Sequence, residues 1–272
     1  MCDVCVMNRV KDQMLSRRSF FKGAAASGIA ATAVATSVAT PALSAGHETV
    51  EDMTYTISPE FPTYGGDPGF SAEKMFNINE HGFNLFQYTM NEHTGTHIDA
   101  PLHFSADGAS VDEIPVSNLV APLCVIDIAA KAADNPDAQV TPDDLKAWIA
   151  ANGEIPDNAC IAMHSGWGSK VETDDYRGFD GKAQHYPGFH VEAAKMLLEE
   201  TGAASLASDT LSLDHGMSAD FATHYAWLPA GRFGIENLAN LDKVPVTGAT
   251  LVVGAPKHEG GTGGPARIFA MI

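Results

Sequence analysis

The chain has 272 residues, of which 45% are hydrophobic and 18% charged, so it is long enough for one large domain with its own core. Acidic residues outnumber basic ones, 34 to 16, and the formal net charge of −18 argues against nucleic acid or an anionic membrane as a partner. Its longest apolar stretch, residues 23–39, consists mainly of Ala, Gly, Thr and Ser, which are too weakly hydrophobic for a membrane anchor.

Residues 1–45 resemble a bacterial twin-arginine export signal. Arg17 and Arg18 precede the alanine-rich stretch, and residues 41–45 offer the small side chains that a signal peptidase accepts. We therefore expect the twin-arginine export machinery to deliver the chain to the periplasm, with a mature domain over residues 46–272. Removing this leader takes away five basic and two acidic residues, which leaves 11 basic and 32 acidic residues and a net charge of −21.

Three of the 11 histidines lie in the short segment from His93 to His103. A spacing of four between His93 and His97 would place both on one face of a helix. However, Gly95 and the β-branched and proline residues after it oppose a helix here. A tight turn that leads into an extended strand fits better. Because side chains alternate along a strand, we expect His97 and Asp99 to project on the same side.

The same segment has the residue types of a metal site. Two imidazoles and a carboxylate that converge in this way suit Zn²⁺, Mn²⁺ or Fe²⁺ and leave coordination positions open for water. His93, His97 and Asp99 are therefore candidate metal ligands. His103 follows Asp99 by four residues and is a candidate acid or base beside the metal.

Apolar runs predict buried strands over residues 120–128, 160–164 and 249–255. Two of these runs contain the cysteines Cys124 and Cys160. We expect both to be buried free thiols, although an oxidising periplasm would also allow a disulfide between them.

Two helices are predicted between and after these strands. Thr141, followed by proline and two acids, predicts the start of a helix that ends near Gly153. The second helix is expected from about His190 to Glu200, with Gly202 as its stop. Strands and helices alternate without a regular rhythm, so the sequence predicts a single mixed α/β domain.

The histidine segment also carries a resemblance to a known family. It resembles the motif H-x-G-T-H-x-D-x-P-x-H of the cyclase family, which includes bacterial kynurenine formamidases, isatin hydrolases and some polyketide cyclases. The resemblance extends over about residues 54–272. Further segments that resemble family motifs are 61–68, 165–167, 208–214, His224 with 234–241, and 260–267.

The resemblance implies the family's swivelling β/β/α fold and a metal centre. By this likeness His93, His97 and Asp99 would hold a first ion, and Asp99 would share a second ion with His224 and Glu236. It also implies Zn or Mn as the metal, with one or two ions bound. Relatives are commonly dimers or larger, with neighbouring chains lining the pocket, so we expect a homo-oligomer.

The expected function is metal-dependent hydrolysis of a small molecule, with His103 as the base. The resemblance implies an amide, cyclic amide or imide (isatin-like), or lactone as the substrate. One alternative is an arylformamidase that hydrolyses N-formylkynurenine, although export counts against it because tryptophan catabolism is normally cytoplasmic. The other is a non-catalytic periplasmic protein that binds a metal or ligand, which would need the metal ligands but not His103.

Several other residues have weaker signals. Asp209 is a candidate either to hydrogen-bond a ligand imidazole or to cap a turn. Four aromatic residues are candidate walls of a substrate pocket, or else core: Phe61, Tyr64, Phe83 and Trp167. Five histidines receive no role: His164, His185, His190, His215 and His258.

Overall fold

The fold is that of a computed structural model, which describes residues 49–272. The predicted leader, residues 1–45, lies outside this part of the chain. Two compact units can be distinguished in the described residues: one comprises 49–71 with 89–272, and the other is a hairpin of residues 72–88. Within residues 49–272, no helix is long and apolar enough to cross a membrane.

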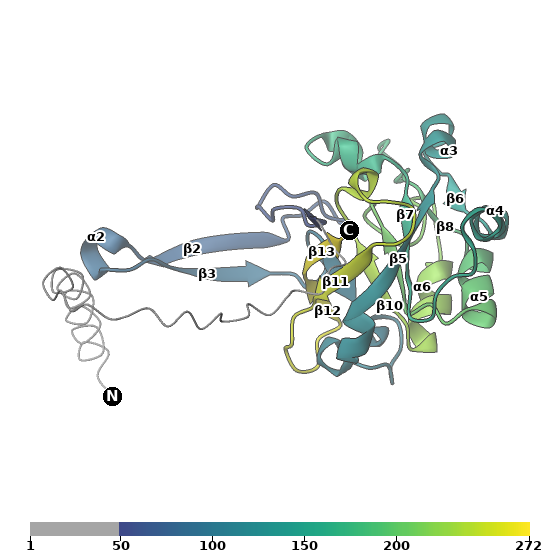
Figure 1. The fold of residues 1–272 in the computed structure, drawn as a ribbon. Helices are drawn as coiled ribbons and strands as arrows, with labels where there is room; N and C mark the ends of the chain where they lie inside the picture. The colour runs from purple at the N-terminus through teal and green to yellow at the C-terminus, as the bar shows by residue number, and fades with distance from the viewer. Residues whose placement is uncertain (1–48) are drawn as a thin grey trace, which may run out of the picture. The chain divides into compact units, whose positions relative to one another are not determined.

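A sheet of nine strands runs through the larger unit of the described chain, in the order β1-β13-β11-β5-β7-β9-β10-β4-β12 (Figure 1). Its centre is parallel, and strands pair antiparallel on both flanks. The parallel strands are β5 (Val120–Asp127), β7 (Cys160–His164), β9 (Ser205–Ser208) and β10 (Phe233–Glu236). The flanking strands are β1 (Val50–Asp52), β4 (His97–Asp99), β11 (Thr250–Gly254), β12 (Gly263–Pro265) and β13 (Arg267–Met271).

Both faces of the central strands are buried, which explains their nearly continuous apolar sequences. Along β5, Leu123 and Val125 enter one core, whereas Cys124 and Ile126 enter the other. Cys124 and Cys160 consequently lie in different cores on opposite faces of the sheet, and both are free thiols. The expectation of buried free thiols is confirmed, and the alternative disulfide does not form.

Helices cover the second of these faces (Figure 1). The helix α4 (Pro142–Asn152) begins at the predicted position, where Thr141 and Asp144 form a capping box. The helix α5 (Val191–Glu200) also lies where predicted, but Thr201 rather than Gly202 forms its C-cap. The sequence analysis did not predict several elements, among them the central strands β9 and β10, the helices α3 (Ala129–Asp134) and α6 (Ala222–Trp227), and a parallel pair, β6 (Gln139–Val140) with β8 (Gly188–Phe189). The mixed α/β prediction is confirmed.

The hairpin consists of β2 (Phe70–Phe76), the short helix α2 (Ile78–His81) and β3 (Leu85–Met90). Asn77 caps α2, and Phe76 packs against Phe83 at the turn. No residue of the unit 72–88 is buried, although several of its side chains are large and apolar. A two-stranded hairpin of this kind is at best marginally stable by itself in water.

Candidate active site

Strand β4 carries the first part of the site and lies between two other strands. In its antiparallel pairing with β10, Glu236 lies opposite His97. The preceding residues form the predicted turn around Gly95, which has a φ of +69°. After β4 the chain enters a 3-10 turn at Pro101–His103, which brings His103 back beside His93.

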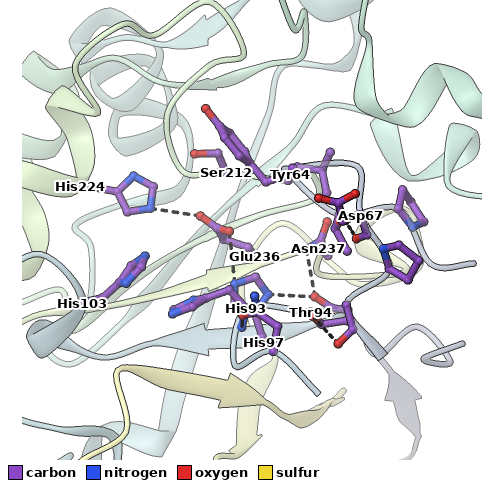
Figure 2. Close-up of a pocket in the computed structure, with 18 of the residues that line it drawn as sticks. Tyr64, Asp67, His93, Thr94, His97, His103, Ser212, His224, Glu236 and Asn237 are labelled. Atoms are coloured by element: carbon purple, nitrogen blue, oxygen red, sulfur yellow. Dashed lines mark hydrogen bonds and ion pairs between the residues drawn. The ribbon is translucent and has the colours of Figure 1, made fainter. Parts of the chain in front are cut away.

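The structure brings together all six side chains that the sequence analysis selected. Figure 2 labels His93, His97, His103, His224 and Glu236 around the pocket. The Asp99 Oδ1 atom lies 2.7 Å from His93 Nδ1 and 3.3 Å from His97 Nε2. The Glu236 carboxylate reaches His97 Nε2 at 3.3 Å and His224 Nε2 at 3.1 Å. Asp99, His97, His224 and Glu236 are at most 6% exposed. The prediction that His97 and Asp99 share one side of a strand is confirmed.

Hydrogen bonds fix which nitrogen of His97 carries its proton. The Nδ1 atom lies 2.9 Å from the Gly95 carbonyl oxygen, which can only accept, so Nδ1 donates. In a neutral ring Nε2 is then a bare acceptor that faces the oxygens of Asp99 and Glu236. Among the described residues, His97 Nε2 and Asp99 Oδ2 are buried without a hydrogen-bond partner. A cation between these atoms would satisfy both.

His224 is oriented in the same way, by Asp214. The Asp214 carboxylate accepts the backbone N–H groups of Thr223 and His224 and lies 2.6 Å from His224 Nδ1. Burial alone would raise the pKa of Asp214, but these hydrogen bonds and the His224 ring lower it, so Asp214 is an acceptor. In a neutral ring, the Nε2 atom of His224 is then without a proton and faces Glu236 and Asp99.

Asp214 is a functional residue that the sequence analysis left without a role, although it lies in the segment 208–214 noted for its family resemblance. The aspartate considered instead, Asp209, accepts hydrogen bonds from the backbone N–H and hydroxyl of Ser165. It contacts none of the six site residues. The hypothesis that Asp209 orients a ligand imidazole is therefore wrong, and the capping alternative describes it.

The pKa directions show that this cluster requires positive charge. Burial alone would lower the pKa of His97, but the neighbouring carboxylates of Asp99 and Glu236 raise it to about 10. Burial opposes protonation of His224 too, yet Asp214, Asp99 and Glu236 raise its pKa well above the ordinary value. The imidazoles and carboxylates thus form a set of donors that fits a divalent metal ion.

Two groups of three residues have their ligand atoms within 4.8 Å of one another, and they share Asp99. One is His97, Asp99 and Glu236; the other is His93, Asp99 and His103. His103 stacks on His93, with ring centroids 3.9 Å apart. Burial lowers the pKa of His103 to about 4, so its ring is neutral near pH 7. His103 is thus near enough to be a ligand as well as a base, and its role remains a prediction.

All the selected site residues except Asp99 line a pocket of about 470 Å³. Tyr64, Phe104 and Phe221 give it aromatic walls. Phe221 has a φ of +50°, an uncommon conformation for a bulky residue, and contacts both Phe104 and His224. Neither Phe104 nor Phe221 was selected from the sequence, although Phe104 directly follows His103.

Of the four aromatic residues considered as pocket walls, Tyr64 alone lines this pocket among the described residues. Trp167 is buried in a separate small core and donates its indole N–H to the Tyr176 carbonyl oxygen. Phe61 is also buried and packs against Tyr176. Phe83 packs within the hairpin unit. The pocket-wall alternative is therefore wrong for these three, and the core alternative describes Phe61 and Trp167. Single aromatic residues carry no signal that separates a pocket wall from core.

The histidines without a predicted role lie away from the pocket lining. Their contacts are with Asp127 for His164, Asp137 for His185, the start of α5 for His190 and Glu92 for His258. His215 is partly exposed.

The mixed α/β fold and the donor set in an aromatic pocket define the class of the protein, which is that of metal-dependent hydrolases. The model of the Cyclase family matches residues 51–215, and the chain belongs to this family. The resemblance drawn from the histidine motif is therefore confirmed.

Curated relatives and solved structures agree with this assignment. The chain is 31% identical over 249 residues to an isatin hydrolase of Roseibium aggregatum, across 85% of this chain and 94% of the relative. It is 28% identical over 219 residues to a kynurenine formamidase of Salinibacter ruber, across 79% and 94%. The structure of isatin hydrolase A from Labrenzia aggregata, bound to benzyl benzoate, superposes with a TM-score of 0.78 at 34% identity, covering 82% of this chain and 93% of that one.

Proposed function

We propose that the protein hydrolyses a cyclic amide or imide of the isatin type. The observation that carries this proposal is the convergence of imidazole nitrogens of His97 and His224 on Asp99 and Glu236 beside an aromatic pocket. The similarity to isatin hydrolases, in sequence and in structure, supports the choice of substrate.

The donor set favours Zn²⁺ or Mn²⁺, since imidazole and carboxylate ligands suit both. His93, His97 and Asp99 would hold one ion, and Asp99 with His224 and Glu236 would hold a second. Bound there, a divalent ion would polarise the substrate carbonyl and lower the pKa of water towards neutrality.

The remaining chemistry belongs to the protein's own side chains. His103 is neutral near pH 7 and lies at the pocket edge of the cluster, so it would accept the proton of the attacking water. It would then return this proton to the leaving nitrogen as the ring opens. Tyr64, Phe104 and Phe221 would hold a planar aromatic ring and exclude water from it.

The test is a hydrolysis screen on formamides, isatin, imides and lactones, with metal content measured on the same preparation. We expect isatin-type lactams to give the highest kcat/KM. Chelation should abolish the activity, and Zn²⁺ or Mn²⁺ should restore it. Full activity in protein that contains no metal would refute the site.

The second candidate is hydrolysis of N-formylkynurenine, which the kynurenine formamidase relative supports. Both reactions cleave a C–N bond beside an aromatic ring, so one pocket can serve either. A kcat/KM for N-formylkynurenine above that for isatin would favour the formamidase. Binding of these compounds without hydrolysis of any would instead support the non-catalytic alternative.

We also propose export to the periplasm by the twin-arginine route, on the pattern of residues 1–45. Because a receptor reads the arginine pair, Arg17→Lys combined with Arg18→Lys should leave the protein in the cytoplasm. Normal periplasmic accumulation of this double variant would overturn the assignment.

A homo-oligomer is proposed on the exposed apolar side chains of the hairpin unit. Met75, Ile78, Leu85 and Phe86 are each more than 40% exposed on a unit without buried residues, so a second copy of the chain would supply the missing cover. The variant Phe86→Glu should shift the mass measured by light scattering towards the monomer, whereas Glu73→Gln on the same unit should not. A wild-type monomer at all concentrations would exclude the proposal.

A further inference from the structure

The glycine-rich segment 260–267 has no role in the proposed chemistry, yet it touches the metal cluster through one side chain. The hydroxyl of Thr262 lies 3.0 Å from His93 Nε2 and 2.6 Å from Glu92 Oε2. The backbone N–H of Thr262 also donates to Glu92 Oε1. Thr262 therefore links Glu92 to His93, and on the other side of the His93 ring Nδ1 lies 2.7 Å from Asp99 Oδ1.

This order of contacts fixes the tautomer of His93. One carboxylate oxygen of Glu92 accepts the backbone N–H of Thr262, and the other accepts its hydroxyl. The single hydroxyl hydrogen of Thr262 is thereby committed to Glu92, and its oxygen can only accept from His93 Nε2–H. In a neutral ring, Nδ1 of His93 is then without a proton. Because it lies 2.7 Å from Asp99 Oδ1, which also only accepts, this tautomer requires a cation between the two atoms.

The backbone of the segment holds Thr262 in this position. The carbonyl oxygen of Thr262 accepts from the Ala100 N–H at 2.8 Å, and the next residue, Gly263, pairs with Asp99 across β12 and β4. Thr262 is therefore anchored to the strand that carries the ligands.

Two glycines allow this close approach. A Cβ atom at Gly263 would lie 2.9 Å from His93 Cε1 and 2.3 Å from the Ile98 carbonyl oxygen. A Cβ atom at Gly261 would lie 2.8 Å from Glu92 Oε1. A larger residue would clash first with the Ile98 backbone at Gly263 and with the His258 ring at Gly261, and then with His93 and Glu92, which gives the glycine-rich composition a physical reason.

We propose that segment 260–267 is a clamp for His93, in which Thr262 and Glu92 are positioning residues that fix the ring nitrogen presented to the metal. The proposal rests on the metal site of the proposed function. It assigns to Thr262 and Glu92 the part that Asp214 plays for His224, since both set the tautomer of an imidazole from outside the cluster. His103 stacks on the clamped ring, so the clamp would also set the position of the proposed base.

The experiment is metal titration of the metal-free protein with Zn²⁺ and with Mn²⁺, against a chromophoric chelator as competitor. Thr262→Val keeps the side-chain shape but can neither accept from His93 nor donate to Glu92. Loss of such an outer hydrogen bond typically weakens metal affinity by about 10–100-fold, and we expect a loss in this range. Thr262→Ser keeps the hydroxyl and should bind like wild type.

Two further variants separate the clamp from a general structural effect. Thr173→Val removes an exposed hydroxyl that donates to the Lys170 carbonyl oxygen, and it should leave metal affinity unchanged. Glu92→Gln keeps an acceptor for Thr262 without the charge, so its loss of affinity should be smaller than that of Thr262→Val. Melting curves of the metal-free variants, recorded in parallel, should show the folded state retained.

The outcomes distinguish the clamp from the proposed function. Wild-type metal affinity in Thr262→Val, or a loss of affinity in Thr262→Ser as large as in Thr262→Val, would overturn the clamp even if the wild type hydrolyses its substrate. A weakened Thr262→Val in a protein that hydrolyses nothing would support the clamp and refute the proposed function. A wild type that binds neither ion would overturn both.

Discussion

The two sides of Asp99 differ in burial and in what orients their imidazoles. On one side, His97, His224 and Glu236 are almost fully buried. On the other, the side chain of His93 is 23% exposed, and His103 stacks on it at the pocket. We therefore expect the buried side to hold positive charge, and the open side to contact substrate and to transfer protons.

The pKa directions follow the same division. The pKa of His97 rises to about 10 because the attraction of two carboxylates for a charged ring outweighs the cost of burying that charge. The pKa of His103 falls to about 4 because burial, together with the neighbouring rings of His93 and His224, outweighs the attraction of the carboxylates. Within one cluster, then, His97 lies where positive charge is favoured, whereas His103 remains neutral.

The largest expected effect comes from breaking the buried side. His97→Ala should lose metal and activity together, because it removes a ligand and leaves Asp99 and Glu236 without the group between them. Metal analysis of the purified variant and its turnover on one substrate check this. Stoichiometric metal with wild-type turnover would show that His97 is not a ligand.

His103→Ala tests the open side and should separate binding from chemistry. Loss of a general base typically lowers turnover by about 10²–10⁴-fold, and we expect a loss in this range. Metal content should remain near that of wild type if His103 is a base only. If it falls as it does in His97→Ala, then His103 is a ligand, as its place in the group with His93 and Asp99 would allow.

Asp214→Asn should produce an intermediate effect. An amide in this position can donate to His224 Nδ1, which would move the ring proton to Nε2 and block the nitrogen that faces Glu236. We expect metal affinity to fall by about 10–100-fold. Asp209→Asn is the matched control, since Asp209 is equally buried but bonds to Ser165, and it should leave metal affinity unchanged.

The smallest expected effect is that of acidification on kcat/KM, which should be nearly independent of pH on the acid side. With a pKa of about 4, the base stays neutral down to pH 5, so kcat/KM at saturating metal should change by less than about twofold between pH 7 and pH 5. A base with the ordinary histidine pKa of about 6.5 would instead lose most of its rate over this interval. A steep fall centred near pH 6.5 would contradict the lowered pKa of His103.

The lowered pKa of His103 also changes how the free energy of unfolding depends on pH. Between about pH 6.5 and pH 4, unfolded His103 binds a proton and the folded residue does not, so this contribution is lost as the pH falls through that window. In the metal-free protein His97 acts in the opposite direction: its contribution is full below pH 6.5 and is lost as the pH rises through about 10. Urea midpoints of metal-free wild type and His97→Ala, compared at several pH values, would measure this contribution.

The sequence predicted the part of the site that is local. His97 and Asp99 could be paired because a period of two relates neighbours on one strand. Glu236 could be added by family resemblance alone, since it meets His97 through a strand pairing across 139 positions, which no local pattern encodes. The sequence likewise could not show which of Asp209 and Asp214 orients an imidazole, because both lie in one turn-rich segment. Asp214 has this role because α6 brings His224 beside it, whereas Asp209 lies beside Ser165.

The placement of Cys124 and Cys160 in different cores has a consequence for measurement. Burial raises the pKa of each thiol to about 12, so neither reacts until its own core opens. In single-cysteine variants, the rate of alkylation would time the opening of each face of the sheet separately. Cys124 would thus report on the helix-covered face and Cys160 on the opposite face. Neither thiol is modified while the protein stays folded.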